Sequence, residues 1–212
     1  MGWAYDTSSQ SVNTGTPRTQ AYTCAAGSQL LVVGLGVRIG PRAGGAPTYN
    51  AVTMTQAGTT RTQGNVSAEL WYLLNPPTGV SHTISVPNTT TTMNVRIIAS
   101  SYIPDPNFIY ALDQTNGNVG TTANPSVSVT NTADGDVVVD MMCHELNTAE
   151  TARNRTLLFS TDEGIWATAA QYYLETTGGA AAAMSHTIGA DNWGLCVASF
   201  RQVMRMATVM ET

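Results

Sequence analysis

Apolar and polar residues alternate along much of the chain, which is the pattern of half-buried β-strands. The clearest case runs from Leu31 to Ile39, where the odd-numbered positions are apolar and Gly34 and Gly36 thin the other face. The same pattern predicts further strands at residues 49–57, 67–74, 81–86, 94–103, 126–130, 136–143, 156–160, 167–175, 184–189 and 193–203. The one candidate helix is residues 145–154, which a polar loop explains equally well.

Turn residues separate these short runs, as in Asn75–Gly79 and Asp134–Gly135. Short strands with this punctuation predict an all-β fold, a two-sheet antiparallel β-sandwich of the jelly-roll kind. Residues 1–23 are polar without a sustained period and are predicted to form an N-terminal arm. Residues 24–203 are predicted to form a single β-sandwich domain, and residues 204–212 a C-terminal tail.

Parts of the chain repeat about a hundred residues apart. The tetrapeptide Ser81–Ile84 recurs identically as Ser185–Ile188. Three further pairs match in the same order: Leu31–Val33 with Val137–Val139, Trp71–Leu73 with Tyr172–Leu174, and Ala99–Ser100 with Ala198–Ser199. The order favours an internally duplicated half-sandwich, although threonine-rich β sequences also resemble one another by chance. Neither half is expected to bury two faces alone, so both are predicted to belong to one domain.

Charge narrows the range of partners. Only 11% of the residues are charged, all nine basic residues are arginine, and the net charge is −5. Nucleic-acid binding is therefore not expected, because it needs a basic patch to neutralise phosphates. A surface with so little charge suits a protein that packs against neighbours or is exported, and a nucleotide bias against lysine codons is the alternative cause. The first residues do not resemble a signal peptide and no membrane partner is expected.

Catalytic motifs are not found. Cys24, Cys143 and Cys196 cannot all pair within one chain and lack the spacing of a zinc site. His82 and His186 occupy matching positions of the repeat, which favours a structural role for both. With no nucleophile elbow, phosphate loop or metalloprotease motif present, we expect no enzyme activity, no cofactor and no metal site.

Two groups of residues are candidates for binding. Trp71, Tyr72, Tyr172 and Tyr173 could stack on sugar rings, although core packing of one neighbour in each pair is the simpler interpretation. The other group is a candidate subunit interface, because Met, Arg and aromatic residues are enriched at protein interfaces. Its members are Trp3, Tyr5, Arg201, Met204, Arg205, Met206 and Met210.

Four stretches of sequence resemble a known module: LLVVGLGVR at 30–38, TYNAVTMT at 48–55, ELWYLLNPPTGVSHTISV at 69–86 and WGLCVASF at 193–200. Together they resemble a jelly-roll β-sandwich module of tailed-bacteriophage virion proteins, over roughly Gln29 to Gln202. The module occurs in capsid decoration proteins and in tail-associated proteins. Ala51 departs from the pattern, which has glycine after Tyr49–Asn50. The resemblance carries no catalytic residues with it.

This resemblance implies a structural virion protein, and first of all a phage capsid decoration (cement) protein. Such a protein binds the outer surface of the shell and stabilises it. Its expected partners are the major capsid protein or other virion subunits, and it is expected to be a homo-oligomer assembled in the host cytoplasm. The alternative is a carbohydrate-binding or tail-fibre module that recognises host surface glycans.

Overall fold

The computed structural model describes residues 4–13, 17–42, 44–87, 93–130, 134–146, 149–162, 166–174, 179 and 181–205, with side chains from residue 17 onward. Over these residues the protein consists of eighteen strands and no helix, and every strand pairing is antiparallel. The predicted all-β antiparallel sandwich is confirmed.

The first half of the chain forms one sandwich of two sheets, here called the first sandwich. Its large sheet has the order β1-β10-β3-β8-β6, with β7 also paired to β8, and its small sheet has the order β2-β9-β4-β5. The strands are β1 (Ala4–Asn13), β2 (Arg18–Tyr22), β3 (Leu30–Arg38), β4 (Thr48–Tyr49), β5 (Val52–Thr53), β6 (Thr55–Gln56), β7 (Arg61–Gln63), β8 (Val66–Leu74), β9 (His82–Val86) and β10 (Asn94–Ile103).

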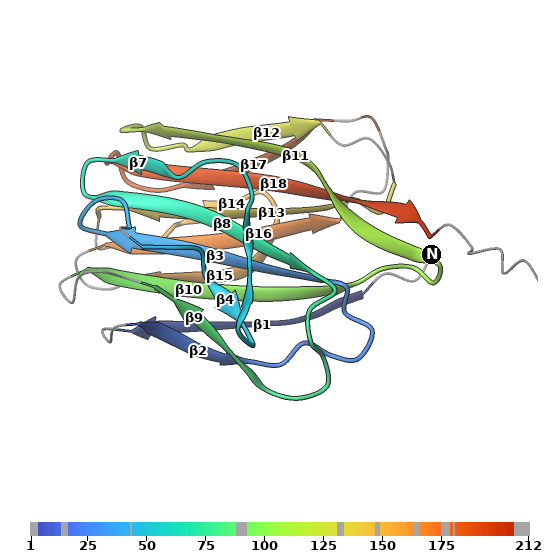
Figure 1. The fold of residues 1–212 in the computed structure, drawn as a ribbon. Helices are drawn as coiled ribbons and strands as arrows, with labels where there is room; N and C mark the ends of the chain where they lie inside the picture. Colours follow the sequence, from blue (N-terminus) through green and yellow to red (C-terminus); the bar gives the residue numbers. More distant parts are fainter. Residues whose placement is uncertain are drawn as a thin grey trace, which may run out of the picture.

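The second half repeats this plan and forms the second sandwich (Figure 1). Its large sheet has the order β11-β18-β13-β16-β15 and its small sheet the order β12-β17-β14, so each strand occupies the place of a strand in the first half. The strands are β11 (Phe108–Gly120), β12 (Ser126–Thr130), β13 (Val137–His144), β14 (Ala152–Arg153), β15 (Thr156–Asp162), β16 (Ala167–Leu174), β17 (Ala181–Thr187) and β18 (Trp193–Met204).

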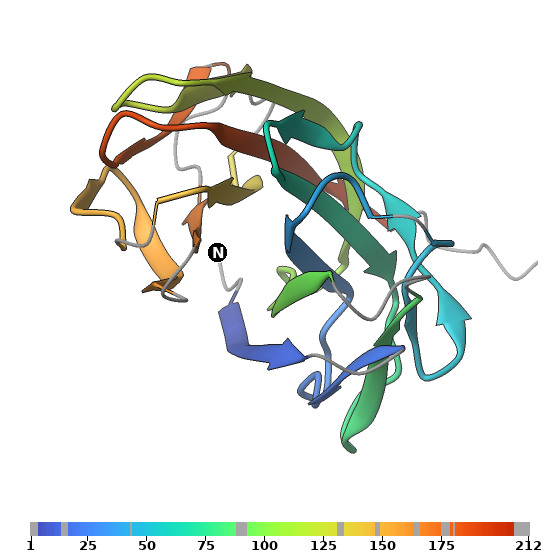
Figure 2. The ribbon, with the colours of Figure 1, turned by 90° about the vertical axis from the view of Figure 1, so that its left-hand side faces the viewer.

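The two sandwiches pack through their large sheets, which gives four layers and three apolar cores. In Figure 2 most of the blue-to-green strands gather at the lower right and most of the yellow-to-red strands at the upper left. Leu31, Val33 and Leu35 belong to the core of the first sandwich, while Leu30 and Val32 belong to the central core between the large sheets. Successive side chains of β3 therefore point into two different cores, which explains why β3 is buried on both faces.

Glycine allows the two large sheets to approach closely. A Cβ atom at Gly34 would lie 2.9 Å from Sδ of Met141, and one at Gly36 would clash with Thr168. The two glycines leave one face of β3 without side chains at these positions, and the second sandwich packs closely against the first there. Larger residues there would force the sheets apart.

The repeat is real in topology, but its unit and its register differ from the prediction. Each half is a whole two-sheet sandwich with its own core, and not a half-sandwich. Ala99 faces the core of the first sandwich, whereas its sequence match Ala198 faces the central core. The Ala-Ser match is therefore one residue out of phase with the structural repeat, and a one-residue shift moves every side chain of a strand to the other face.

Two segments differ from what the pattern suggested. Within the predicted N-terminal arm, residues 4–13 form β1 at the edge of the large sheet and residues 18–22 form β2. The candidate helix 145–154 is wrong where the structure describes it, because residues 145–146 and 149–151 are irregular and residues 152–153 form β14. The alternative of a polar loop fits these residues.

The first and last described strands meet at one end of the molecule. Ala4 at the start of β1 pairs with Ile103, and Met204 at the end of β18 pairs with Phe108. Ile103 and Phe108 are joined by a four-residue connection, and the backbone N–H of Arg205 donates to the Asn107 carbonyl at 2.8 Å. Both ends of the described chain therefore lie beside the connection between the sandwiches.

Candidate functional site

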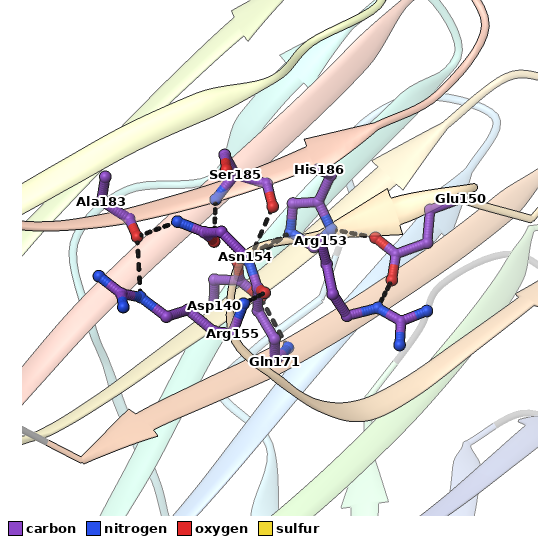
Figure 3. A network of polar contacts seen from close by, with 9 residues as sticks. All are labelled: Asp140, Glu150, Arg153, Asn154, Arg155, Gln171, Ala183, Ser185 and His186. Atoms are coloured by element: carbon purple, nitrogen blue, oxygen red, sulfur yellow. Dashed lines mark hydrogen bonds and ion pairs between the residues drawn. The ribbon is translucent and has the colours of Figure 1, made fainter.

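The most concentrated set of ionisable side chains lies inside the second sandwich, around His186 (Figure 3). His186 is on β17 in the small sheet, and it faces Asp140 on β13 and Gln171 on β16 in the large sheet. Glu150 approaches from the segment before β14. All four residues are buried, so we call them the buried histidine cluster.

Hydrogen bonds join every member of the buried histidine cluster. Nε2 of His186 donates to Oδ2 of Asp140 at 2.8 Å, and Nδ1 donates to Oε2 of Glu150. The backbone N–H of Gln171 donates to Oδ1 of Asp140 at 2.8 Å, and its side-chain amide donates to Oδ2 at 2.9 Å. Arg153 donates from Nε to the remaining oxygen of Glu150.

The cluster holds the imidazole in its charged form. Burial alone would lower the pKa of His186, but the charge and hydrogen bond of Asp140, together with Glu150, outweigh burial and raise the pKa to about 9. A charged imidazole has two N–H donors, which matches its two carboxylate acceptors. With the partly exposed Arg153 as the second cation, two positive groups balance the two carboxylates of the cluster.

Further hydrogen bonds connect β14 and the residues that follow it to β17. Asn154 donates to the Ala183 carbonyl at 2.8 Å and accepts from the Ser185 N–H at 2.9 Å. Arg155 lies 3.9 Å from the ring centroid of Tyr173, and its backbone N–H donates to Oε1 of Gln171 at 3.0 Å. The polar groups of the cluster therefore act on one another and on the backbone, which is the arrangement of a structural network.

The first sandwich buries a simpler group in the corresponding place, between its own two sheets. Glu69 on β8 accepts from Nη2 of Arg42 at 3.1 Å and from the Trp71 indole N–H at 2.8 Å. The Arg42 guanidinium lies 5.6 Å from the Trp71 ring centroid and also donates to the carbonyls of Gly45 and Pro87. Here a permanently charged arginine takes the place that a histidine has in the second sandwich.

The four aromatic residues considered for glycan stacking all contribute to cores. Trp71 is only 9% exposed and bonded to Glu69, and Tyr72 packs edge-on against Phe200 with ring centroids 5.3 Å apart. Tyr172 packs against the central core, and Tyr173 packs against the core of the second sandwich beneath Arg155. This geometry offers no support for a sugar-stacking pair.

The candidate interface residues fall into two groups. Arg201, Met204 and Arg205 are exposed at the end of β18, and Met204 is 72% exposed. Tyr5 lies on β1, where the backbone alone is described, and Trp3, Met206 and Met210 lie outside the described residues. The structure thus exposes Arg201, Met204 and Arg205 at the end of the molecule where β1 begins.

Sequence reasoning missed most of the buried histidine cluster. It noted His186 but not Asp140, Glu150 or Gln171. One signal was present, since Asp140 is the only charge within the apolar run Val137–Cys143. A lone carboxylate in a strand that is otherwise apolar indicates a buried polar partner elsewhere in the chain.

Metal sites, membrane-spanning helices and known relatives give no further indication of function. Across the ranges described, no three His, Cys, Asp or Glu side chains are arranged to hold a metal ion. No helix long and apolar enough to cross a membrane is found in the described part of the chain. Comparisons with protein-family models, with curated proteins and with solved structures find no match to this chain.

Proposed function

We propose that this chain is a structural subunit of a bacteriophage virion, a decoration protein that binds the outside of the shell and stabilises it. The sequence resemblance suggests the particle, and the observation that supports a structural role is the use of the ionisable side chains. The buried histidine cluster and the Glu69–Arg42 pair hold sheets together, and both are enclosed between layers. These ionisable side chains, which are of the types that enzymes use in catalysis, thus stabilise the fold.

The four-layer arrangement supports the same proposal. Two sandwiches fused through their large sheets resist bending, because relative movement would disrupt a tightly packed central core. Glu145 adds a polar bridge between them: its carboxylate accepts from the Asn65 backbone N–H at 2.5 Å and from the Asn192 side chain at 2.8 Å. A stiff block is what a protein that clamps neighbouring shell subunits requires.

The end of the molecule that carries Met204 is the proposed contact with the shell. The described chain begins and ends there, and Arg201, Met204 and Arg205 expose the residue types that interfaces favour. Homo-oligomer contacts and contacts to the major capsid protein are both compatible with this end.

The decisive measurement is the copy number of this chain in gradient-purified particles, relative to the major shell protein. A ratio near one, or another simple lattice fraction, supports the decoration role. A few copies per particle would move the protein to the tail, and absence from particles would overturn the proposal.

A point variant tests the proposed contact without removing a strand. Deleting the first twenty residues would remove β1, so we favour Met204→Ser. It should weaken binding to particles that lack the chain, since it removes an exposed apolar side chain from the contact. Leu157→Ser is the matched control, because Leu157 is also exposed, at 40%, but lies on β15. Equal binding by the two variants would exclude this end as the contact.

A further inference from the structure

His144 is a second buried histidine of the second sandwich, and it has no role in the buried histidine cluster. It is the last residue of β13, is fully buried, and pairs with Ala167 on β16 and Trp193 on β18. Within the part of the chain described, neither ring nitrogen has a hydrogen-bond partner. Buried polar atoms are nearly always bonded, so this residue calls for an explanation.

Four charged groups influence the pKa of His144 without forming a hydrogen bond to its ring. Asp191 precedes β18, Glu150 precedes β14, Asp162 ends β15, and His186 lies on β17. On its own strand it lies four residues after Asp140. Burial is the largest influence and lowers the pKa of His144, and the positive charge of His186 acts in the same direction, while the three carboxylates oppose them.

Residues next to His144 cover this end of the sandwich. The backbone N–H of Glu145 donates to the Asn192 carbonyl at 3.1 Å, and the Glu145 carboxylate bonds both Asn192 and the Asn65 backbone. We call residues 145–146 and 189–192 the cap. The cap joins the second sandwich to the β7–β8 turn of the first, where Gly64 has no room for a side chain beside Asn192 and Glu145.

We propose that His144 is an acid-sensitive lock: a proton on its ring opens the cap and releases the β7–β8 turn of the first sandwich. In the observed arrangement of the described residues, neither ring nitrogen of His144 has an acceptor, and the buried Oδ2 of Asp191 in the cap is also unpaired, so a charged imidazole can gain a hydrogen bond or hydration only if the covering residues move. The cap directly follows His144 and is irregular chain between strands, which opens at a lower free energy than paired strands do.

The direction of the pH dependence follows from linkage. A histidine whose pKa is lowered by folding destabilises the folded state as pH falls below the unfolded value of 6.5. Below pH 6.5, uptake of one proton multiplies the opening constant by up to tenfold per pH unit, so the gain between pH 7.5 and pH 5 is up to about 30-fold. His186 keeps its charge over this interval, because its pKa is near 9.

Hydrogen–deuterium exchange of the full chain at about pH 7.5 and about pH 5, corrected for intrinsic exchange, tests the proposal. We expect increased opening of the cap and of residues 64–66 at the lower pH, while β3 and β10 stay protected. His144→Leu should abolish the increase. His82→Leu is the matched control: this half-buried histidine of the first sandwich packs against Tyr49 and should leave the increase unchanged.

Two results would overturn the lock. One is acid-induced opening of the cap that persists in His144→Leu. The other needs no variant and so holds even if His144→Leu does not fold: exchange in the unaltered chain that does not increase at the cap between the two pH values, or increases equally in both sandwiches.

Discussion

The two sandwiches share their strand order but bury charge differently. In the first, Glu69 is neutralised by Arg42 and capped by Trp71, and the group contains no histidine. In the second, Asp140 and Glu150 share His186, and Arg153 completes the balance. Arginine stays charged at any pH at which the protein folds, whereas histidine does not. The same fold therefore carries one charge group without a histidine and one built around a histidine whose pKa is raised to about 9.

The largest effect should come from breaking the second group. Asp140→Ala leaves a charged His186 and the Gln171 amide without their acceptor inside the sandwich. Removal of one partner of a buried ion pair typically costs about 3–5 kcal/mol. Urea unfolding of the variant should show a loss of this size in the free energy of unfolding.

Asp134→Ala serves as the control for this variant, since Asp134 is an exposed turn residue beside Gly135. Its free energy of unfolding should change little. A comparably small loss for Asp140→Ala would mean that the buried histidine cluster does not hold the second sandwich together.

A smaller effect, with a distinct pH profile, is expected for His186→Gln. Loss of hydrogen bonds to charged partners should cost about 2–3 kcal/mol near neutral pH. Because folding raises the pKa of His186 to about 9, its stabilisation is complete below pH 6.5 and is lost as pH rises towards 9. Urea unfolding across this range should show a slope in the unaltered chain that the variant lacks.

Arg42→Met sharpens the comparison with the first sandwich. It should be destabilising because it leaves Glu69 buried without its cation. The slope between pH 6.5 and pH 9 should remain as in the unaltered chain, since His186 is intact. A slope that disappears in Arg42→Met but persists in His186→Gln would reverse the assignment of the pH response to the second sandwich.

The fold could be predicted where strands alternate or are apolar, but two outer strands of the large sheets, β1 and β11, were missed. β3, β8 and β10 have continuous or alternating apolar residues because both faces are covered. β11 is the longest strand, yet it was not predicted, because its second half is Gln, Thr, Asn and Gly. An edge strand packs on fewer neighbours, so its sequence carries less of the hydrophobic pattern.

The pairing of sandwiches was predictable only in part. Gly34 and Gly36 indicated a close approach on one face of β3, but not what approaches it. The identical Ser-His-Thr-Ile segments suggested equivalent places for the two histidines. His82 is instead the first residue of β9, whereas His186 lies near the end of β17 among carboxylates. Contacts between residues 31–46 positions apart, such as His186 with Asp140, depend on register, which a tetrapeptide does not fix.

A gain in stability is expected from Ala51→Gly, a substitution in the first sandwich. The β4–β5 turn places Asn50 at φ 49° and Ala51 at φ 63°, a left-handed conformation that glycine adopts without strain. Glycine was expected at this position, and the backbone has the conformation that glycine favours. Relief of the Cβ contact should stabilise the protein by about 1 kcal/mol, seen as a higher urea midpoint.

Asn50→Gly is its control, because asparagine tolerates the left-handed region far better than alanine does. It should shift the midpoint much less. Destabilisation by Ala51→Gly would mean that the turn relies on the alanine side chain and not on its backbone conformation.

The smallest effect on stability concerns the outer strand β11, the counterpart of β1 in the first sandwich. The backbone N–H groups of Gly117 and Val119 donate to the side chains of Asn116 and Asn118, at 2.8 and 2.9 Å. Being two residues apart, these donors point to the same edge of the strand, and the asparagines occupy them. The Asn116 amide also donates to the Ser128 carbonyl on β12 at 2.8 Å.

Replacing both residues, Asn116→Thr with Asn118→Thr, should cost less than about 1 kcal/mol, because the bonds are exposed to water. It should nevertheless raise self-association, since two donors on an outer strand become available for pairing with another chain. Sedimentation velocity over a concentration series would detect association beyond that of the unaltered chain. An unchanged profile would show that the asparagines do not protect this edge, and that the polar composition of β11 has another cause.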